Sequence, residues 1–347
     1  MKQEISFAFG LNEIKDTAKL STGLINHSYK ITTVDGKQFL LQQINTKVFL
    51  DPMAIQENYF TIRNFLGHKH SFSLPNLIKT VNGELLYKED AETWRCFEYI
   101  PNTYSPLIAS SAEEAYLVAK CFGKFSADLS DLDTATVKTI LPGFHDLALR
   151  FDQFTTALNN ASAERKASAK ELLQNLEEHS YLLEYYKNVL SKPALYPLHI
   201  LHHDCKIANI LFYNTTNHIH SPIDLDTTQP GYFFSDIGDM IRSMAPNIPE
   251  DAKEIEDMQL RTDFIEAINE GYLESMHAHL TTAEIQDLQF AGKIIIYMQA
   301  LRYVTDFLNN DTYYRISYPT QNKDRAANQL KLLQLLTAYT KNKALVG

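Results

Sequence analysis

Residues 202–209 read HHDCKIAN, and residues 223–226 read IDLD. The octet gathers two histidines, an aspartate, a lysine and an asparagine, and the second stretch adds two carboxylates to an apolar run. One interpretation is a polar surface loop that leads into a strand. The other is a phosphoryl-transfer site, which needs a base for the acceptor hydroxyl, a cation that faces phosphate, and metal ligands.

Four polar residues of these stretches each suit one part of phosphoryl transfer. Asp204 can accept the proton of an attacking hydroxyl, and Lys206 can offset charge on the γ-phosphate. Asn209 can bind a metal ion through its amide oxygen, and Asp224, on the next expected strand, can bind metal ions between the phosphates. Mg²⁺ prefers hard oxygen ligands, so one carboxylate, one amide and the nucleotide oxygens suit it.

The neighbouring residues of the two stretches are expected to have lesser functions. His202 is expected to hold the loop rather than to carry a proton, and His203 to be incidental. Cys205 is expected to be a passive neighbour of the base. Asp226 is either a second metal or substrate contact or a turn residue, and the sequence leaves both open.

Composition narrows the class of protein. The 347 residues are 45% hydrophobic and 21% charged, as in an ordinary globular chain with one large core or two smaller ones. A net charge of −10 disfavours a nucleic-acid binder, which needs an electropositive surface. Three widely spaced cysteines disfavour a disulfide framework or zinc site and favour a reducing cytoplasm. We see no signal peptide and no apolar run near the ~20 residues that span a bilayer, so no membrane partner is expected.

The first hundred residues have the patterns of a β-rich region with one helix. Asp35-Gly36 lies between two β-type runs and is a strong hairpin signal. Asp51 as N-cap and Pro52 at the first helical position begin a helix that Gly67 is expected to end. The β-type runs are residues 28–34, 37–44, 75–80, 84–88 and 93–100, the third and fourth being an expected strand pair around Asn82-Gly83.

Beyond Pro101-Asn102 the chain becomes mainly helical. Helical patterns occupy residues 111–129, 144–190 and much of 250–347, and short strands flank the octet. The fold class predicted is α+β, with a small antiparallel β-rich N-lobe at residues 1–100 and a larger, mainly helical C-lobe at residues 101–347.

The two stretches together resemble a known family. His202-x-Asp204, followed by Asn209, is similar to the catalytic-loop pattern shared by protein kinases and aminoglycoside phosphotransferases. Ile223-Asp224 takes the place of that family's metal-binding aspartate. The resemblance implies a two-lobe, protein-kinase-like fold, in which the N-lobe covers the nucleotide and supplies the hinge strand.

A third motif follows in the order of the same family. Residues 235–239, SDIGD, resemble a later element in which an aspartate braces the catalytic loop from behind. The resemblance implies that Asp236 supports the loop, as His202 is expected to do.

Longer stretches resemble one branch of the family, the N-acetylhexosamine 1-kinases. Members of that branch phosphorylate the anomeric hydroxyl of GlcNAc or GalNAc with ATP and Mg²⁺. The resemblance implies that Asp204 is the general base, Lys206 a phosphate contact, and Asn209 and Asp224 the metal ligands. The stretches are LLQQINTKVFLDP (40–52), FGKFSADLSDL (122–132), LPGFHDLALRFDQF (141–154), DLDTTQPGYFFSDIGDMIR (224–242) and LRYVTDFLNNDTYY (301–314).

The chain departs from the family in its N-lobe. A typical member has a lysine on the third strand, paired with a glutamate on the first helix. Here Gln42 or Gln43 takes the place of the lysine, and Glu57 lies suitably on the helix without a known partner. The sequence does not identify what replaces the lysine.

The nucleotide contacts expected from the resemblance lie in the N-lobe. The glycine-rich loop, STGLINHSY at residues 21–29, contains only Gly23. Its backbone and the Asn26 side chain are expected to cover the phosphates, with Gln42 as a further donor. Glu98 and Tyr99, on the expected hinge strand, would offer backbone groups to adenine.

Sugar recognition is expected from other segments. Arg302, in the stretch that resembles the C-terminal helix of the hexosamine kinases, is one candidate, and Asp306 lies one turn further along the same helix face. His27 is a candidate from the N-lobe loop. Arg302 and Asp306 can equally be members of a helix salt bridge or charged residues at the edge of the core.

The sequence therefore predicts an ATP- and Mg²⁺-dependent kinase whose partners are a nucleotide and a small sugar. Two alternatives stay open. One is a kinase for another small acceptor, such as an aminoglycoside, choline, homoserine or a different sugar. The other is a nucleotide-binding pseudokinase, which the missing lysine favours and the intact Asp204, Asn209 and Asp224 disfavour. The preferred sugar epimer and the oligomeric state are left open.

Overall fold

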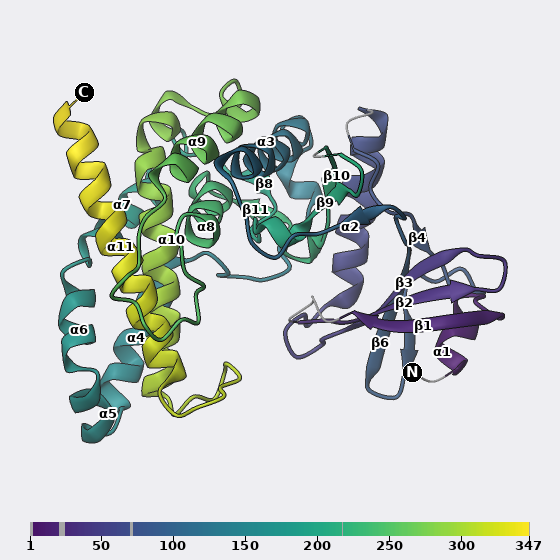
Figure 1. The fold of residues 1–347 in the computed structure, drawn as a ribbon, viewed down its shortest axis with the longest axis horizontal. Helices are drawn as coiled ribbons and strands as arrows, with labels where there is room; N and C mark the ends of the chain where they lie inside the picture. The colour runs from purple at the N-terminus through teal and green to yellow at the C-terminus, as the bar shows by residue number, and fades with distance from the viewer. Residues whose placement is uncertain (1–2, 21–24, 70–71, 217, 347) are drawn as a thin grey trace. The chain divides into compact units, whose positions relative to one another are not determined.

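The computed structural model describes residues 3–20, 25–69, 72–216 and 218–346 (Figure 1). The chain forms two compact units. The first consists of residues 1–107, 128–141 and 208–229, and the second of residues 108–127, 142–207 and 230–347. The division into lobes at residues 1–100 and 101–347 stays a prediction.

An antiparallel sheet dominates the first unit. The strand order is β1-β2-β3-β6-β4, and β5 also pairs with β6. The predicted hairpin is confirmed, because β2 and β3 pair antiparallel across a turn in which Gly36 has φ +84°, a conformation that costs glycine little. The strands are β1 (Ile14–Leu20), β2 (His27–Thr33), β3 (Gln38–Ile44), β4 (Leu77–Ile78), β5 (Tyr87–Glu89) and β6 (Glu92–Glu98).

The strand pair predicted at residues 75–80 and 84–88 is wrong. β4 and β5 each pair with the longer β6, opposite Cys96–Phe97 and opposite Glu92–Trp94. The turn between them is closed by hydrogen bonds of 2.8 Å from the Thr80 N–H to the Glu84 carbonyl and from the Gly83 N–H to the Thr80 carbonyl. The turn signal at residues 82–83 was therefore real, but the strands beside it find their partner elsewhere in the sheet.

Helix α2 (Pro52–His68) begins as predicted. The Asp51 carboxylate accepts a hydrogen bond of 3.1 Å from the Ala54 N–H, and Pro52 is the first helical residue. Helix α1 (Gln3–Ala8) contributes Ile5 to the core beneath the sheet. The buried members of that core are Ile5, Phe9, Leu11, Ile31, Leu41, Trp94 and Cys96.

A smaller sheet completes the first unit. Its order is β10-β9-β7, with β7 at Thr103–Tyr104, β9 at Ile210–Tyr213 and β10 at Ile219–Pro222. The short helix η2 (Ile207–Asn209) leads into β9, and η3 (Leu225–Thr227) follows β10. The two ends of this hairpin carry the sequence stretches that suggested the fold.

The second unit is built around α10, a helix of 27 residues that begins with a capping box between Thr281 and Glu284. It packs against α4, α8 and α11, and Figure 1 shows α10 and α11 side by side. The elements are α3 (Ala112–Asp128), α4 (Leu147–Asn160), α5 (Ala163–Ser168), α6 (Lys170–Glu177), α7 (Tyr181–Leu190), β8 (His199–Leu201), β11 (Gln229–Gly231), α8 (Phe234–Met244), α9 (Thr262–Met276), α10 (Thr282–Leu308) and α11 (Gln321–Val346).

Helices α8 and α10 approach each other at Gly238. A Cβ atom at this position would lie 2.5 Å from Cγ1 of Ile295 and 2.6 Å from the carbonyl oxygen of Ala291. The missing side chain thus permits the contact that fixes α8, the helix that carries Asp236.

The predicted fold class is confirmed: an antiparallel, β-rich N-lobe accompanies a larger helical C-lobe. Within the described ranges, every helix is too short or too polar to span a bilayer.

Candidate active site

The loop that follows β8 is held by two carboxylates of α8. Asp236 accepts hydrogen bonds from the N–H groups of His202 (3.1 Å) and His203 (2.8 Å), and it is fully buried. Asp239 accepts a hydrogen bond of 2.8 Å from the N–H of Cys205. The loop N–H groups on both sides of Asp204 are thus bonded to α8 carboxylates, and these contacts fix the backbone around Asp204. The contact of Asp236 is the kind expected of a residue that braces the loop, whereas Asp239 was not predicted.

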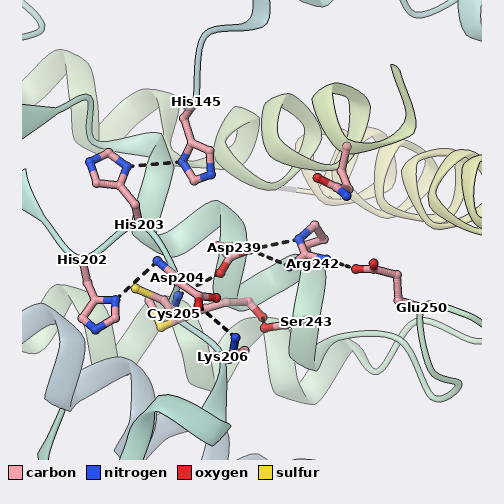
Figure 2. A network of polar contacts seen from close by, with 12 residues as sticks. His145, His202, His203, Asp204, Cys205, Lys206, Asp239, Arg242, Ser243 and Glu250 are labelled. Atoms are coloured by element: carbon pink, nitrogen blue, oxygen red, sulfur yellow. Dashed lines mark hydrogen bonds and ion pairs between the residues drawn. The ribbon is translucent and has the colours of Figure 1, made fainter. Parts of the chain in front are cut away.

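Asp204 is paired with the lysine of the octet. Its Oδ2 lies 2.9 Å from Nζ of Lys206, and the two side chains are 24% and 34% exposed (Figure 2). Since the flanking His203 and Cys205 are buried, Asp204 and Lys206 are the side chains of this segment that a ligand could reach. The arrangement suits a base whose negative charge is balanced by a neighbouring cation.

His202 has a structural setting. Its ring is fully buried and packs edge-on against Phe122, with 4.9 Å between ring centroids, and near Phe125 at 6.0 Å. The N–H of Asp204 donates to its Nδ1 over 3.3 Å, which makes Nδ1 an acceptor. These contacts support the expected role of His202 in holding the loop.

His203, expected to be incidental, is a closely packed residue. Its backbone is left-handed, with φ +67°, and its side chain is buried. A Cβ atom on Gly231 would lie 2.3 Å from its ring, so this glycine leaves the space that the ring occupies. Nδ1 of His203 lies 3.4 Å from Nδ1 of His145, and a dashed line in Figure 2 marks this contact between the two rings.

The His145 ring is surrounded by positive charge. Burial, the neighbouring His203 and the arginines Arg302, Arg242 and Arg150 lower the pKa of His145 well below its usual range. Only one of the two facing nitrogens can carry a proton between them. The contact between the two histidines is therefore most favourable when His145 is neutral.

An ionic network extends from the loop to α10. The Arg242 guanidinium pairs with Asp239 at 2.8 Å and also with Glu250 (Figure 2). Glu250 in turn accepts a hydrogen bond from the Tyr303 hydroxyl of α10. Burial raises the pKa of Asp239, and Arg242 opposes that shift. Burial lowers the pKa of Arg242, but the carboxylates of Asp239 and Glu250 outweigh it and raise the pKa above its usual value.

The two candidate metal ligands lie in the first unit, at the two ends of the β9–β10 hairpin. The N–H of Ile223 donates a hydrogen bond to the carbonyl of Asn209 over 2.9 Å. This bond joins the two ends of the hairpin at Asn209 and at the residue before Asp224. Asp224 does not lie on a strand as predicted, because β10 ends at Pro222. It caps η3 with a left-handed backbone, at φ +60° and ψ +55°.

The side chains of Asn209 and Asp224 suit a magnesium ion as ligands. One carboxylate and one amide oxygen are hard ligands, and a Mg²⁺ ion carried by a nucleotide needs few protein ligands. Across the described residues, no three His, Cys, Asp or Glu side chains gather as a metal site that would be complete without a nucleotide.

Asp226 is the buried partner of an arginine that the sequence analysis missed. Its two oxygens accept hydrogen bonds of 2.6 and 2.8 Å from the Arg95 guanidinium, and Asn26 donates a further one of 2.8 Å. Nε of Arg95 donates to Oε1 of Gln42 over 3.0 Å, and Gln42 in turn donates to Oγ of Ser28. A charged residue within the apolar run TWRCFEYI was the one signal that pointed to Arg95.

The other residues predicted in the N-lobe have mixed settings. The N–H groups of Glu98 and Tyr99 are engaged, with the carbonyls of Asn76 (2.9 Å) and Gln38 (3.1 Å). His27 is exposed at the start of β2. Gly23 lies outside the described residues. Glu57 is paired with Lys138, so the helix glutamate has a partner other than a strand lysine.

The two substrate candidates on α10 differ. The Arg302 guanidinium lies 5.9 Å from the ring centroid of Phe144 and 5.7 Å from that of Tyr314. The Asp306 carboxylate accepts backbone hydrogen bonds from residues 312, 313 and 314 and one from the Asn322 side chain. Asp306 therefore shapes the 312–314 segment, a function that the sequence did not predict, and its substrate role stays a prediction.

Comparison with known proteins gives one family. A model described as "Phosphotransferase enzyme family" matches residues 16–279. Among solved structures, an aminoglycoside phosphotransferase from Alicyclobacillus acidocaldarius is similar at 13% identity and a TM-score of 0.65, over 99% of this chain and 96% of that one. A microcompartment-associated aminopropanol kinase is similar at 15% identity and a TM-score of 0.64, over 98% and 97%. An amicoumacin kinase in complex with AMP-PNP, Ca²⁺ and Ami is similar at 13% identity and a TM-score of 0.57, over 93% and 88%. At these identities the structural likeness concerns the fold.

Proposed function

This chain belongs to the phosphotransferase enzyme family, and on that premise we propose that it phosphorylates the anomeric hydroxyl of an N-acetylhexosamine with ATP and Mg²⁺. Membership of this family makes the protein a kinase-type phosphotransferase. The identities of the acceptor, the nucleotide and the metal ion are our proposal. The observation that carries the proposal is the partly exposed Asp204 carboxylate, 2.9 Å from Lys206 on a loop pinned by Asp236 and Asp239.

Asp204 acts as the base in this proposal. It accepts the proton of the sugar hydroxyl while the hydroxyl oxygen forms a bond to the γ-phosphorus, and the bond from that phosphorus to the β–γ bridging oxygen breaks. Lys206 contacts the transferred phosphoryl group. Asn209 follows Asp204 by five positions, so the chain alone keeps their Cα atoms within about 18 Å of each other.

Asn209 and Asp224 would hold the metal ion through their side-chain oxygens. Bound Mg²⁺ would supply positive charge against the charge that develops at the β–γ bridge. The amicoumacin kinase, which has the same fold, was solved with AMP-PNP and Ca²⁺, and this supports a nucleotide and a divalent cation for the present chain.

The charges near His145 support a neutral acceptor. Arg150 and Arg302 hydrogen-bond to neutral groups among the described residues, and burial together with Arg302 lowers the pKa of Arg150. These two arginines would repel aminoglycosides, choline and other cationic amines. A neutral N-acetylhexosamine would meet no such repulsion.

The test is an ADP-release assay with a panel of acceptors, followed by location of the phosphate on the product by NMR. We expect turnover with GlcNAc or GalNAc and a phosphate on C1. Activity on choline, homoserine or an aminoglycoside, with none on these sugars, would overturn the proposal that the acceptor is an N-acetylhexosamine. Nucleotide binding without turnover on any acceptor would favour a pseudokinase.

The base is tested by Asp204→Asn, which keeps the size of the side chain. We expect kcat to fall by about 10²–10⁴-fold, because the proton acceptor is lost. Thermal-shift titration should show that ADP still binds. The control is Asp131→Asn, which removes an exposed ion pair with Lys69 and should leave kcat unchanged. Normal turnover by Asp204→Asn would show that another group is the base.

A further inference from the structure

Arg95 supplies the buried positive charge that strand β3 lacks. Gln42 on β3 and Arg95 on β6 are directly opposed in the antiparallel register, and their side chains are joined by the 3.0 Å hydrogen bond from Nε of Arg95. The positive charge thus lies on β6, the strand next to β3 in the same sheet, rather than on β3 itself.

The partner of this cation is Asp226. The side chains of Arg95 and Asp226 are 2% and 5% exposed, and two hydrogen bonds of 2.6 and 2.8 Å join them in the bidentate geometry of an arginine–carboxylate pair. A buried ion pair is tolerated only when its hydrogen-bonding groups are satisfied, and here Gln42 and Asn26 complete it. Both Asp226 oxygens are engaged, so Asp226 is directed away from a role as a metal ligand.

The pair acts on the turn that carries Asp224. Asp226 lies within η3, two residues after Asp224, and the N–H of Thr228 donates to the carbonyl of Leu225 over 3.0 Å to close that turn. The left-handed conformation of Asp224, at φ +60°, is unfavourable for a residue with a side chain and persists only where the surroundings enforce it. Two hydrogen bonds from Arg95 to Asp226 tie η3 to strand β6 of the sheet.

We propose that Arg95 and Asp226 form a positioning pair that holds the Asp224 carboxylate in the orientation needed for the metal ion. This inference rests on the proposed function, and in particular on Asp224 as a metal ligand. Arg95 takes over the structural task of the missing strand lysine without touching the nucleotide. The open choice for Asp226 is thereby resolved as neither metal ligand nor substrate contact.

The experiment measures Mn²⁺ binding to the enzyme–ADP complex by electron paramagnetic resonance, together with the Mg²⁺ dependence of kinase activity. The variants are Arg95→Lys, which keeps the charge but loses the bidentate geometry, and Asp226→Asn. We expect each to weaken Mn²⁺ binding by at least tenfold and to raise the half-saturating Mg²⁺ concentration by a similar factor. KM for the acceptor should stay within about twofold. Arg63→Lys, on α2 outside the network, should behave like the wild type.

A double variant separates positioning from folding. Arg95→Met with Asp226→Leu removes both buried charges, so it is expected to fold even where a single variant does not. We expect it to remain weak in Mn²⁺ binding, because η3 has lost its anchor. Wild-type Mn²⁺ affinity in the double variant or in Arg95→Lys would overturn the positioning role proposed for Arg95 and Asp226.

Two further outcomes have distinct meanings. If Arg95→Lys weakens ADP binding in the absence of metal and leaves Mn²⁺ affinity unchanged, Arg95 is a phosphate contact and the positioning role is wrong. If the wild-type protein itself binds no Mn²⁺–ADP, the proposed function fails, and the inference fails with it.

Discussion

Cys205 is the nearest thiol to the proposed base, yet its surroundings make it unreactive. The side chain is fully buried, and burial together with the Asp236 and Asp239 carboxylates raises the pKa of the thiol well above its usual range. Cys96 and Cys121 are also buried, and burial raises the pKa of Cys96 to about 12. Because the thiolate is the reactive form, none of the three should react at neutral pH.

Thiol titration with a chromogenic disulfide checks this expectation. The native protein should release almost no chromophore over minutes and keep its kinase activity, whereas the denatured protein should titrate three thiols. Rapid modification of Cys205 with loss of activity would mean that the loop opens around Asp204.

At the same scale, the chemistry of the polar octet is predictable from local sequence, whereas its distant partners are not. Asp204, Lys206 and Asn209 follow a short pattern that can be recognised within eight residues. Arg95 and Asp226 are 131 residues apart, and no local pattern links an arginine in an apolar strand to one particular aspartate. The contact between His203 and His145 has no local signal for the same reason, since it depends on how segments 58 residues apart pack.

Among the elements, the α8–α10 contact gives a prediction of stability. Gly238→Ala places a Cβ atom against Ile295 and the backbone of Ala291, and we expect a loss of about 1–3 kcal/mol from overpacking. Gly67→Ala is the control, because a Cβ at this position of α2 meets no atom within 4 Å. It should stabilise by about 0.5–1 kcal/mol, since alanine loses less backbone entropy in a helix.

Urea denaturation of the two variants measures both values, with unchanged m-values as the check that unfolding is comparable. Equal stability of Gly238→Ala and the wild type would mean that α8 can shift along α10. In that case Asp236 and Asp239 would shift with it, and kinase activity would report the displacement.

Elements with strong local signals were predictable, and strand partners were not. The β2–β3 turn and the start of α2 each depend on residues adjacent in sequence. The pairing of β4 and β5 with β6 depends on which strand offers free backbone groups in the folded sheet, and periodicity does not reveal this. β1 has five successive exposed residues, so it lacks the alternation by which a half-buried strand is recognised.

For the whole molecule, the protonation of His145 links stability to pH. Its pKa in the folded protein lies below the value of about 6.5 expected in the unfolded chain. Below pH 6.5 the unfolded chain therefore binds more protons, and stability falls as the pH decreases, by at most about 1.4 kcal/mol per pH unit from this group. Above pH 6.5 the group makes no pH-dependent contribution.

Thermal unfolding between pH 5.5 and 7.5 tests this link. His145→Gln removes the titrating ring, so its melting temperature should depend less on pH in the lower half of that range. The exposed His218 provides the control, because His218→Gln should keep the slope of the wild type. An unchanged slope in His145→Gln would place the pH dependence on other groups.

The outer position of β1 has a consequence for the protein in a crowded solution. Among the described strands, β1 pairs on one side only, with β2, and Lys15, Asp16 and Lys19 stand among its exposed residues. An unpaired strand edge invites a strand from another molecule, and charged side chains discourage such addition because the newcomer would crowd and desolvate them. The strand that sequence patterning recognises least well is thus the one that protects the sheet from edge-to-edge aggregation.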